Sequence, residues 1–260
     1  MTVTGLIGLI IVGSFFGMMI IFNVVKSGSS EAKLRPIPAF MKIKRAIGLA
    51  VEDGSQLHVS LGRGGVTNPQ SASAFVGLSM MEQIIRIASS GDHPPVATTG
   101  NAALAILAQD TIRGAYKAIN LEESDSSAAG ELVGLTPFSY AVGTLSKMQG
   151  SEVSASLLAG WYGSEITWLT TAGERTNTFT LAGTAHLPAQ AVMYAAASET
   201  LIGEELFAGG AYLGAGSMHE ASLSTQDVFR WVIVSGILIG IILKLVGFGP
   251  LIQDLLAGTP

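Results

Sequence analysis

Three short segments of this chain combine glycine with polar side chains in a way that suits a small anionic ligand. Each follows an apolar run typical of a β-strand and precedes a run of helical spacing; the segments are residues 98–101, 160–165 and 183–186. In an open parallel sheet, such junctions meet at one edge, where helix N-termini present unpaired N–H groups and a partial positive charge. The polar side chains expected to face a ligand there are Asn101, Ser164, Glu165, Thr184 and His186.

The same residue types also have a structural explanation. Strand-to-helix turns use glycine for tight geometry and Ser, Thr or Asn for capping, whether or not a ligand binds. His186, at a predicted helix start, suits a general acid or base, and it equally suits a hydrogen-bonded turn. Arg63, flanked by glycines, fits either a carboxylate or phosphate clamp or a solvated loop residue. Glu204 and Glu205 offer catalytic carboxylates or favourable charge at a helix N-terminus.

No phosphate-binding, nucleophile or metal motif accompanies these junctions. Residues 62–65 lack the spacing of a dinucleotide fingerprint, and neither Gly-x-x-x-x-Gly-Lys-Ser/Thr nor Gly-x-Ser-x-Gly occurs. The four histidines are far apart, show no His-x-x-x-His spacing, and are not joined by any cysteine. We therefore expect no metal site and no bound cofactor.

The composition places part of the chain in lipid. Of its 260 residues, 48% are hydrophobic and only 13% are charged, and the mean hydropathy is +0.49. Soluble domains carry charge on about a quarter of their residues. A fully soluble enzyme is therefore disfavoured, and the high apolar content argues against disorder.

Two apolar segments are long enough to cross a bilayer as helices. Residues 5–25 contain no charged side chain, and no basic residue precedes them, so an uncleaved anchor fits better than a secretory signal peptide. The second run begins at Trp231 and contains Lys244, whose ammonium can reach the interface near one end. Residues 224–227 offer N-cap chemistry just before this second span.

Charge predicts which way the spans face. Residues 26–45 carry six basic side chains and one acidic one, whereas residues 46–227 carry six basic and seventeen acidic ones, a net charge of −11. The basic excess beside the first span predicts a cytoplasmic middle and two outside termini. The same cations suit anionic lipid headgroups, or serve only as the topology signal. The acidic domain makes nucleic acid an unsuitable partner.

The resulting map has six parts: a transmembrane helix (1–25), a basic juxtamembrane segment (26–45), a cytoplasmic α/β domain (46–213), a linker (214–227), a second transmembrane helix (228–252) and a tail (253–260). Each span has two glycines four residues apart, and these are Gly13, Gly17, Gly236 and Gly240. Such pairs let helix backbones approach closely in lipid, either within one chain or between subunits.

Between the spans, β-like and helical runs alternate. Residues 46–51 and 56–61 predict a hairpin around an Asp-Gly turn. Helical spacing follows in 71–90 and 102–118, and Thr136-Pro137 predicts the start of another helix. Further strands are expected in the ranges 95–99, 131–135, 153–161, 178–183 and 197–203. The alternation predicts an α/β fold with a mainly parallel sheet flanked by helices, and one transmembrane helix at each end.

Several strings within this pattern resemble a known protein family. They are VATTGNAALAILAQDTIRGAY (96–116), LLAGWYGSEI (157–166) and LIGEELFAGGAYLGAG (201–216). With the two spans and the basic segment, they resemble an uncharacterised family of bacterial two-span membrane proteins with a central α/β domain. The resemblance covers nearly the whole chain and implies this architecture, but no activity.

Two classes of function remain. The first is a non-enzymatic scaffold or accessory protein in the cell membrane that forms homo-oligomers or contacts other membrane proteins. The alternative is a membrane-tethered ligand-binding or catalytic domain, acting on a small anionic metabolite or lipid headgroup at the three junctions. A pore built from several hairpins has the least support, because the spans lack a polar stripe.

Overall fold

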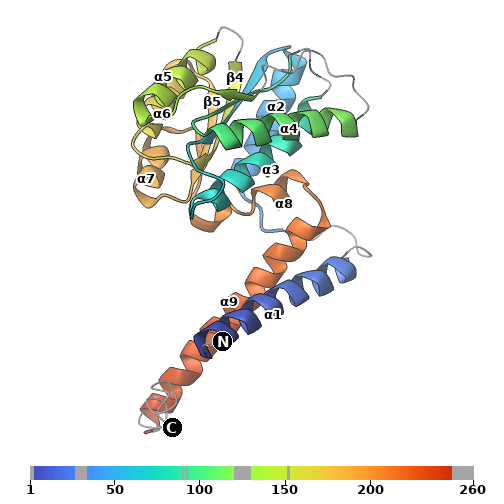
Figure 1. Ribbon diagram of the computed structural model, residues 1–260, viewed down its shortest axis with the longest axis vertical. Helices are drawn as coiled ribbons and strands as arrows, with labels where there is room; N and C mark the ends of the chain where they lie inside the picture. The colour runs from blue at the N-terminus through green and yellow to red at the C-terminus, as the bar shows by residue number, and fades with distance from the viewer. Residues whose placement is uncertain are drawn as a thin grey trace. The chain divides into compact units, whose positions relative to one another are not determined.

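The computed structural model describes residues 3–26, 34–89, 91, 93–119, 130–150 and 153–247. The chain divides into two compact units (Figure 1). One is the α/β unit, Lys33–Ala215, and the other combines Met1–Ala32 with Gly216–Pro260.

The α/β unit contains a six-stranded sheet in which every recorded pairing of the described residues is parallel. The strands are β1 (Gln56–Gly62), β2 (Val96–Thr99), β3 (Gly130–Leu132), β4 (Val153–Trp161), β5 (Phe179–Thr184) and β6 (Glu199–Leu201). Their spatial order is β3-β2-β1-β4-β5-β6. This is the strand order of doubly wound sheets, in which the order of the strands, not their direction, reverses between the first and fourth strands. The predicted α/β class is confirmed.

Helices cover both faces of the sheet (Figure 1). One face packs against α2 (Pro38–Glu52), α3 (Ser71–Ala88), α4 (Ala102–Ala118) and the short α8 (Gly209–Leu213), and the other against α5 (Pro137–Met148), α6 (Ile166–Arg175) and α7 (Leu187–Ala196). A 3-10 turn, η2 (Gly203–Glu205), follows β6. A separate apolar core fills the space between the sheet and the helices on each face. Because side chains alternate along a strand, Leu157 of β4 lies in the core beneath α2 and α3, and Leu158 lies in the core beneath α5 and α6.

The predicted helix start at Thr136 is confirmed. Thr136 Oγ1 accepts a hydrogen bond from the backbone N–H of Ser139 at 3.2 Å, and Ser139 Oγ accepts one from the backbone N–H of Thr136 at 3.0 Å. Pro137 occupies the first turn, where its missing N–H leaves no intrahelical hydrogen bond unmade. All of these contacts lie within residues 136–139, which is why the sequence alone predicts this helix start.

The strand predicted over residues 46–51 is wrong, because these residues belong to α2. Buried side chains recur along α2 at helical spacing, and they are Ala39, Phe40, Ile43, Ile47 and Ala50. The helix extends back to Pro38, into residues 26–45, for which the sequence predicts a basic juxtamembrane segment but no helix. Only the second strand of the predicted hairpin forms, as β1.

The two ends of the α/β unit lie side by side. The ring of Phe40 in α2 stacks on that of Tyr212 in α8, with centroids 4.7 Å apart. Tyr212 also donates a hydrogen bond to the carbonyl oxygen of Arg35 at 2.6 Å, and Arg35 forms a 3.0 Å ion pair with Glu205. The segments that lead to the two terminal helices are thereby tied together.

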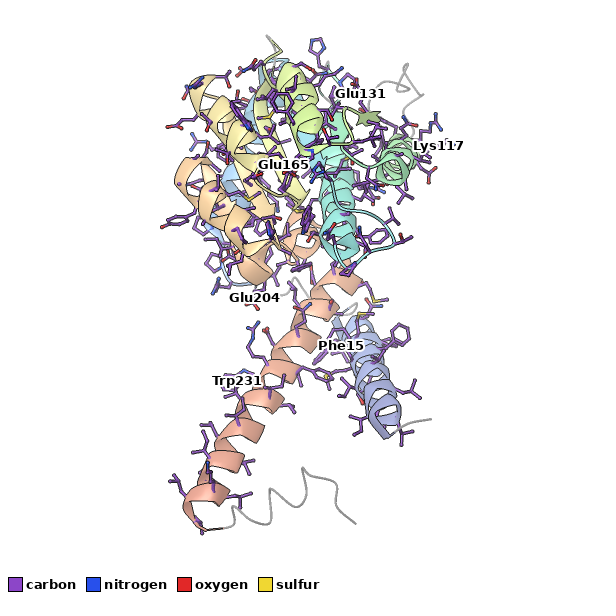
Figure 2. All side chains as sticks on the ribbon, turned by 60° about the vertical axis from the view of Figure 1, so that its left-hand side comes forward. Phe15, Lys117, Glu131, Glu165, Glu204 and Trp231 are labelled. Carbon is purple, nitrogen blue, oxygen red and sulfur yellow. The ribbon has the colours of Figure 1, made fainter. Side chains whose placement is uncertain are left out.

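The second unit contains the two helices long and apolar enough to cross a membrane. They are α1 (Val3–Lys26) and α9 (Ser217–Leu245), and their side chains are exposed along most of their length (Figure 2). The predicted start of the second helix at residues 224–227 is wrong, because α9 begins at Ser217 and includes most of the expected linker. The last part of the predicted second span, residues 248–252, and the predicted tail, residues 253–260, lie outside the described part of the chain.

A buried histidine links the three central strands of the sheet. His58 Nδ1 of β1 lies 2.8 Å from Ser156 Oγ of β4, and His58 Nε2 lies 3.0 Å from Thr98 Oγ1 of β2. Burial lowers the pKa of His58 to about 3, with a smaller contribution from the positive charge of Lys147. The ring is therefore neutral at pH 7, with one nitrogen donating and the other accepting a hydrogen bond.

We expect His58 to make the protein less stable in acid. Between about pH 6.5 and pH 3 the unfolded chain takes up a proton on this side chain that the folded chain does not, so stability present above pH 6.5 is lost as pH falls. The expected contribution is about 1.4 kcal/mol per pH unit. Unfolding of the full chain in detergent at several pH values measures it, with His58→Asn as the variant and the exposed His93→Gln as the control. If the free energy of unfolding of His58→Asn falls with decreasing pH as steeply as that of the wild type, His58 is not the cause of the acid sensitivity.

Candidate functional site

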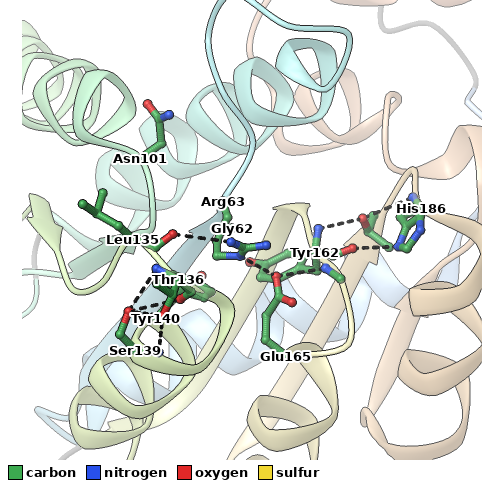
Figure 3. Close-up of polar contacts among 12 residues, drawn as sticks. Gly62, Arg63, Asn101, Leu135, Thr136, Ser139, Tyr140, Tyr162, Glu165 and His186 are labelled. Carbon is green, nitrogen blue, oxygen red and sulfur yellow. Dashed lines mark hydrogen bonds and ion pairs between the residues drawn. The ribbon is translucent and has the colours of Figure 1, made fainter.

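A charged pair occupies the point where the strand order reverses. Arg63 directly follows β1, and Glu165 lies in the loop between β4 and α6. Arg63 Nε donates to Glu165 Oε1 at 2.9 Å, and the two side chains are 17% and 2% exposed. Figure 3 shows the pair between Leu135 and Tyr162. In doubly wound sheets, the region beyond the carboxyl ends of the first and fourth strands is the usual ligand site.

Neighbouring backbone atoms hold both members of the pair in place. Arg63 Nη1 donates to the carbonyl oxygen of Leu135 at 3.5 Å, while Glu165 Oε1 also accepts from the backbone N–H of Gly163 at 2.9 Å. A Cβ atom at Gly100 would lie 2.5 Å from Arg63 Cγ, so the missing side chain makes room for the arginine stem. The position of the guanidinium is thus set by three separate loops.

Three hydroxyl groups form a buried cluster between β1, β4 and α5. Tyr162 Oη donates to the carbonyl oxygen of Ser60 at 2.6 Å and lies 2.9 Å from Ser60 Oγ. Tyr140 Oη also bonds to Ser60 Oγ. Burial raises the pKa of both tyrosines, so both hydroxyls are protonated at neutral pH. The cluster is suited to holding the loops, not to accepting protons.

His186 lies immediately before α7 with a fixed ring orientation. Its Nδ1 lies 2.9 Å from the carbonyl oxygen of Tyr162, and this hydrogen bond requires a proton on Nδ1. The ring is tilted by 34° against that of Trp161, with centroids 5.3 Å apart. Thr184 Oγ1 accepts from the backbone N–H groups of His186 at 3.3 Å and Tyr162 at 3.4 Å. The arrangement joins the loops after β4 and β5.

The five predicted ligand-binding residues fall into separate groups. Thr184 and His186 share one hydrogen-bonded loop, and Glu165 pairs with Arg63. Asn101 Oδ1 instead caps α4 by accepting from the backbone N–H of Leu104 at 3.1 Å, and Ser164 is exposed. In Figure 3, Asn101 and His186 lie on opposite sides of Arg63.

Two features of this edge were not predicted from the sequence. The spacing did not indicate that Arg63 and Glu165 pair, because they are 102 positions apart and meet only when β1 lies beside β4. Nor did it indicate Tyr140, whose position in α5 matches an ordinary core residue. Within the described ranges, no three His, Asp or Glu side chains are grouped to hold a metal ion.

The comparison with family models gives one result. The model described as "Domain of unknown function (DUF6754)" matches residues 2–254. The chain belongs to the DUF6754 family. The match covers almost all of both units, in agreement with the expectation of an uncharacterised family that extends over nearly the whole chain. Neither the curated proteins nor the solved structures gave a match.

In this DUF6754 chain, the terminal helices α1 and α9 contact each other through an aromatic pair and a side-chain hydrogen bond. The rings of Phe15 in α1 and Phe229 in α9 have centroids 5.5 Å apart, and Ser217 Oγ donates to Asn23 Oδ1 at 2.8 Å. Cβ atoms added to the four predicted packing glycines would meet nothing within 4 Å, and these are Gly13, Gly17, Gly236 and Gly240. The contact between α1 and α9 therefore does not use them.

We expect the Arg63–Glu165 pair to be energetically coupled. Arg63→Met leaves the buried carboxylate without its partner and should cost about 3 kcal/mol of unfolding free energy. Adding Glu165→Gln should restore part of the loss, because no unpaired buried charge then remains. A double-mutant cycle on the full chain in detergent measures a coupling of more than about 1 kcal/mol.

The half-exposed pair of Arg86 and Glu82, one helical turn apart in α3, is the matched control. Its coupling should be about 0.5 kcal/mol, since solvent screens both charges. Additive effects at Arg63 and Glu165 would show that their 2.9 Å contact adds no stability.

Proposed function

We propose that this protein is a membrane-anchored scaffold or accessory subunit that assembles with copies of itself. In this proposal α1 and α9 cross the cell membrane, the α/β unit lies in the cytoplasm and both termini lie outside. The six cations in residues 26–45 support this orientation, because basic residues beside a span favour the cytoplasmic side.

The open glycine faces carry the proposal. Helices gain no hydrophobic energy by associating in lipid, so close backbone approach at small residues contributes most of the attraction. Gly13 and Gly17 lie on one side of α1, Gly236 and Gly240 lie on one side of α9, and added Cβ atoms would meet open space at all four. These surfaces are free to pack against helices of another copy.

Exposed apolar side chains on the α/β unit offer a second contact surface. Leu135, Phe138 and Val142 lie within two turns around the start of α5 and are 67%, 71% and 51% exposed. Phe138 and Val142 are four residues apart, so they are neighbours on the helix surface. Such a patch on a surface helix fits a protein contact better than solvent.

We expect bulky substitutions at the glycines to prevent assembly. Gly13→Leu with Gly17→Leu, or Gly236→Leu with Gly240→Leu, keeps the helix apolar but holds neighbouring backbones apart. Native mass spectrometry or electron microscopy of the full chain in mild detergent should show a defined oligomer for the wild type and mainly monomer for the variants.

Gly8→Leu is the matched control. Gly8 also has open space around it, yet it precedes Gly17 by nine residues and so lies on the opposite side of a helix with about 3.6 residues per turn. This variant should assemble like the wild type. A monodisperse wild-type monomer would overturn the proposed self-association.

The position of Arg63 favours a second candidate function, the binding of a small anion. The guanidinium lies at the reversal point of the sheet, and a phosphate or carboxylate can replace Glu165 as its partner. The ligand-binding function considered from the sequence thus centres on Arg63 and Glu165.

This second function predicts that the two members of the pair, when substituted, change a phosphate-induced shift in melting temperature in opposite directions. Inorganic phosphate at about 10 mM should raise the melting temperature of the full chain in detergent, since a ligand that binds only the folded state stabilises it. Glu165→Gln should enlarge the shift because the competing carboxylate is lost, and Arg63→Met should abolish it. Sodium chloride at equal ionic strength is the control, and equal shifts in all variants would exclude binding at Arg63.

A further inference from the structure

We propose that the outer face of α2 binds anionic lipid headgroups and holds the α/β unit against the membrane surface. This inference rests on the proposed membrane anchoring, and adds a specific lipid-binding surface to it. The eleven residues 27–37 between α1 and α2 span at most about 40 Å, so α2 begins within reach of the surface from which α1 would emerge.

The face of α2 opposite the core carries both positive and apolar side chains. Its inner face is buried against the sheet through residues such as Ile43 and Ile47. On the outer face, Lys44 and Arg45 are exposed, and Met41 and Leu49 are 60% and 48% exposed. The exposed Glu52 lies at the C-terminal end of the same face, so the two cations occupy its middle and leave it a net charge of +1. Cations beside exposed apolar side chains are typical of helices that lie in a membrane interface.

The charges of this face differ from those around it. Lys42 pairs with Glu199, whereas no ion pair of Lys44 or Arg45 is found within the described parts of the chain. Residues 46–227, by contrast, have a net charge of −11. An anionic surface is therefore attracted to α2 and repelled by most of the rest of the unit.

Lipid fits this face better than nucleic acid does. Each cation close to an anionic membrane strengthens binding about fivefold. The apolar side chains of Met41 and Leu49 gain further by entering the headgroup layer, but they have no comparable partner on a phosphate backbone. Nucleic acid would in addition meet the acidic surface of the unit.

A single label at position 48 tests the proposal in the full chain. The protein contains no cysteine, and a Cβ at Gly48 would meet nothing within 4 Å, so Gly48→Cys accepts an environment-sensitive dye without displacing a neighbour. The labelled chain is inserted into nanodiscs of zwitterionic lipid, or of the same lipid with about a third anionic lipid. We expect a blue-shifted emission and at least twofold less quenching by neutral acrylamide in the anionic discs only. About 0.5 M salt should reverse both effects, because it shortens the Debye length.

Charge-removing variants show whether α2 itself is responsible. Lys44→Gln with Arg45→Gln should abolish the lipid-dependent change. Lys117→Gln with Arg175→Gln, which removes one exposed lysine and one exposed arginine from α4 and α6, should leave it intact. An unchanged melting temperature shows that each variant remains folded.

The outcomes separate this proposal from the one on which it depends. A chain that fails to enter nanodiscs of either kind overturns membrane anchoring itself. A chain that inserts but gives the same emission and quenching in both lipids overturns only the lipid contact. If that common emission is blue-shifted relative to free dye in buffer, α2 contacts protein instead.

Discussion

The pairing of β1 with β4 is the interaction on which the α/β unit depends. These strands join the two halves of the doubly wound sheet, and polar side chains reinforce the joint at three levels. The contacts are His58 with Ser156 inside the sheet, Ser60 with Tyr162 near the carboxyl edge, and Arg63 with Glu165 beyond it. Close packing also contributes, since a Cβ at Gly160 would lie 2.1 Å from the carbonyl oxygen of Leu61.

This joint explains why the candidate site has both a structural and a chemical interpretation. Doubly wound sheets usually bind ligands beyond the strand ends where their halves meet, so polar groups at this edge would face a ligand if one were bound. In this chain the same groups satisfy one another: the arginine has its carboxylate, and His186 donates to a backbone carbonyl. A ligand at this edge would have to compete with the existing ion pair, so substitutions of Arg63 and Glu165, and not of Asn101 or Ser164, test the proposed anion binding.

Local signals in the sequence predicted much of the sheet and several helix ends. The Thr136-Pro137 start and the strands near 96–99 and 153–161 depend on capping, proline geometry and apolar runs, all of which act over a few residues. The helix α2 was missed because residues 46–51 alone resemble a strand, and the buried spacing is visible only from Ala39 onward. The Arg63–Glu165 pair depends on strand order, which no local pattern encodes.

The ends of the α/β unit constrain how it is connected to its proposed anchors. Because Phe40 stacks on Tyr212 and Tyr212 bonds to the carbonyl oxygen of Arg35, the chain enters and leaves the unit through one region. Two connections from one region allow α1 and α9 to pair, as Phe15 and Phe229 do, without stretching the sheet between them. Pairing at the phenylalanines leaves the glycine faces unused within the chain. In the proposed membrane assembly, these glycine faces are therefore the surfaces at which the helices of other copies would pack.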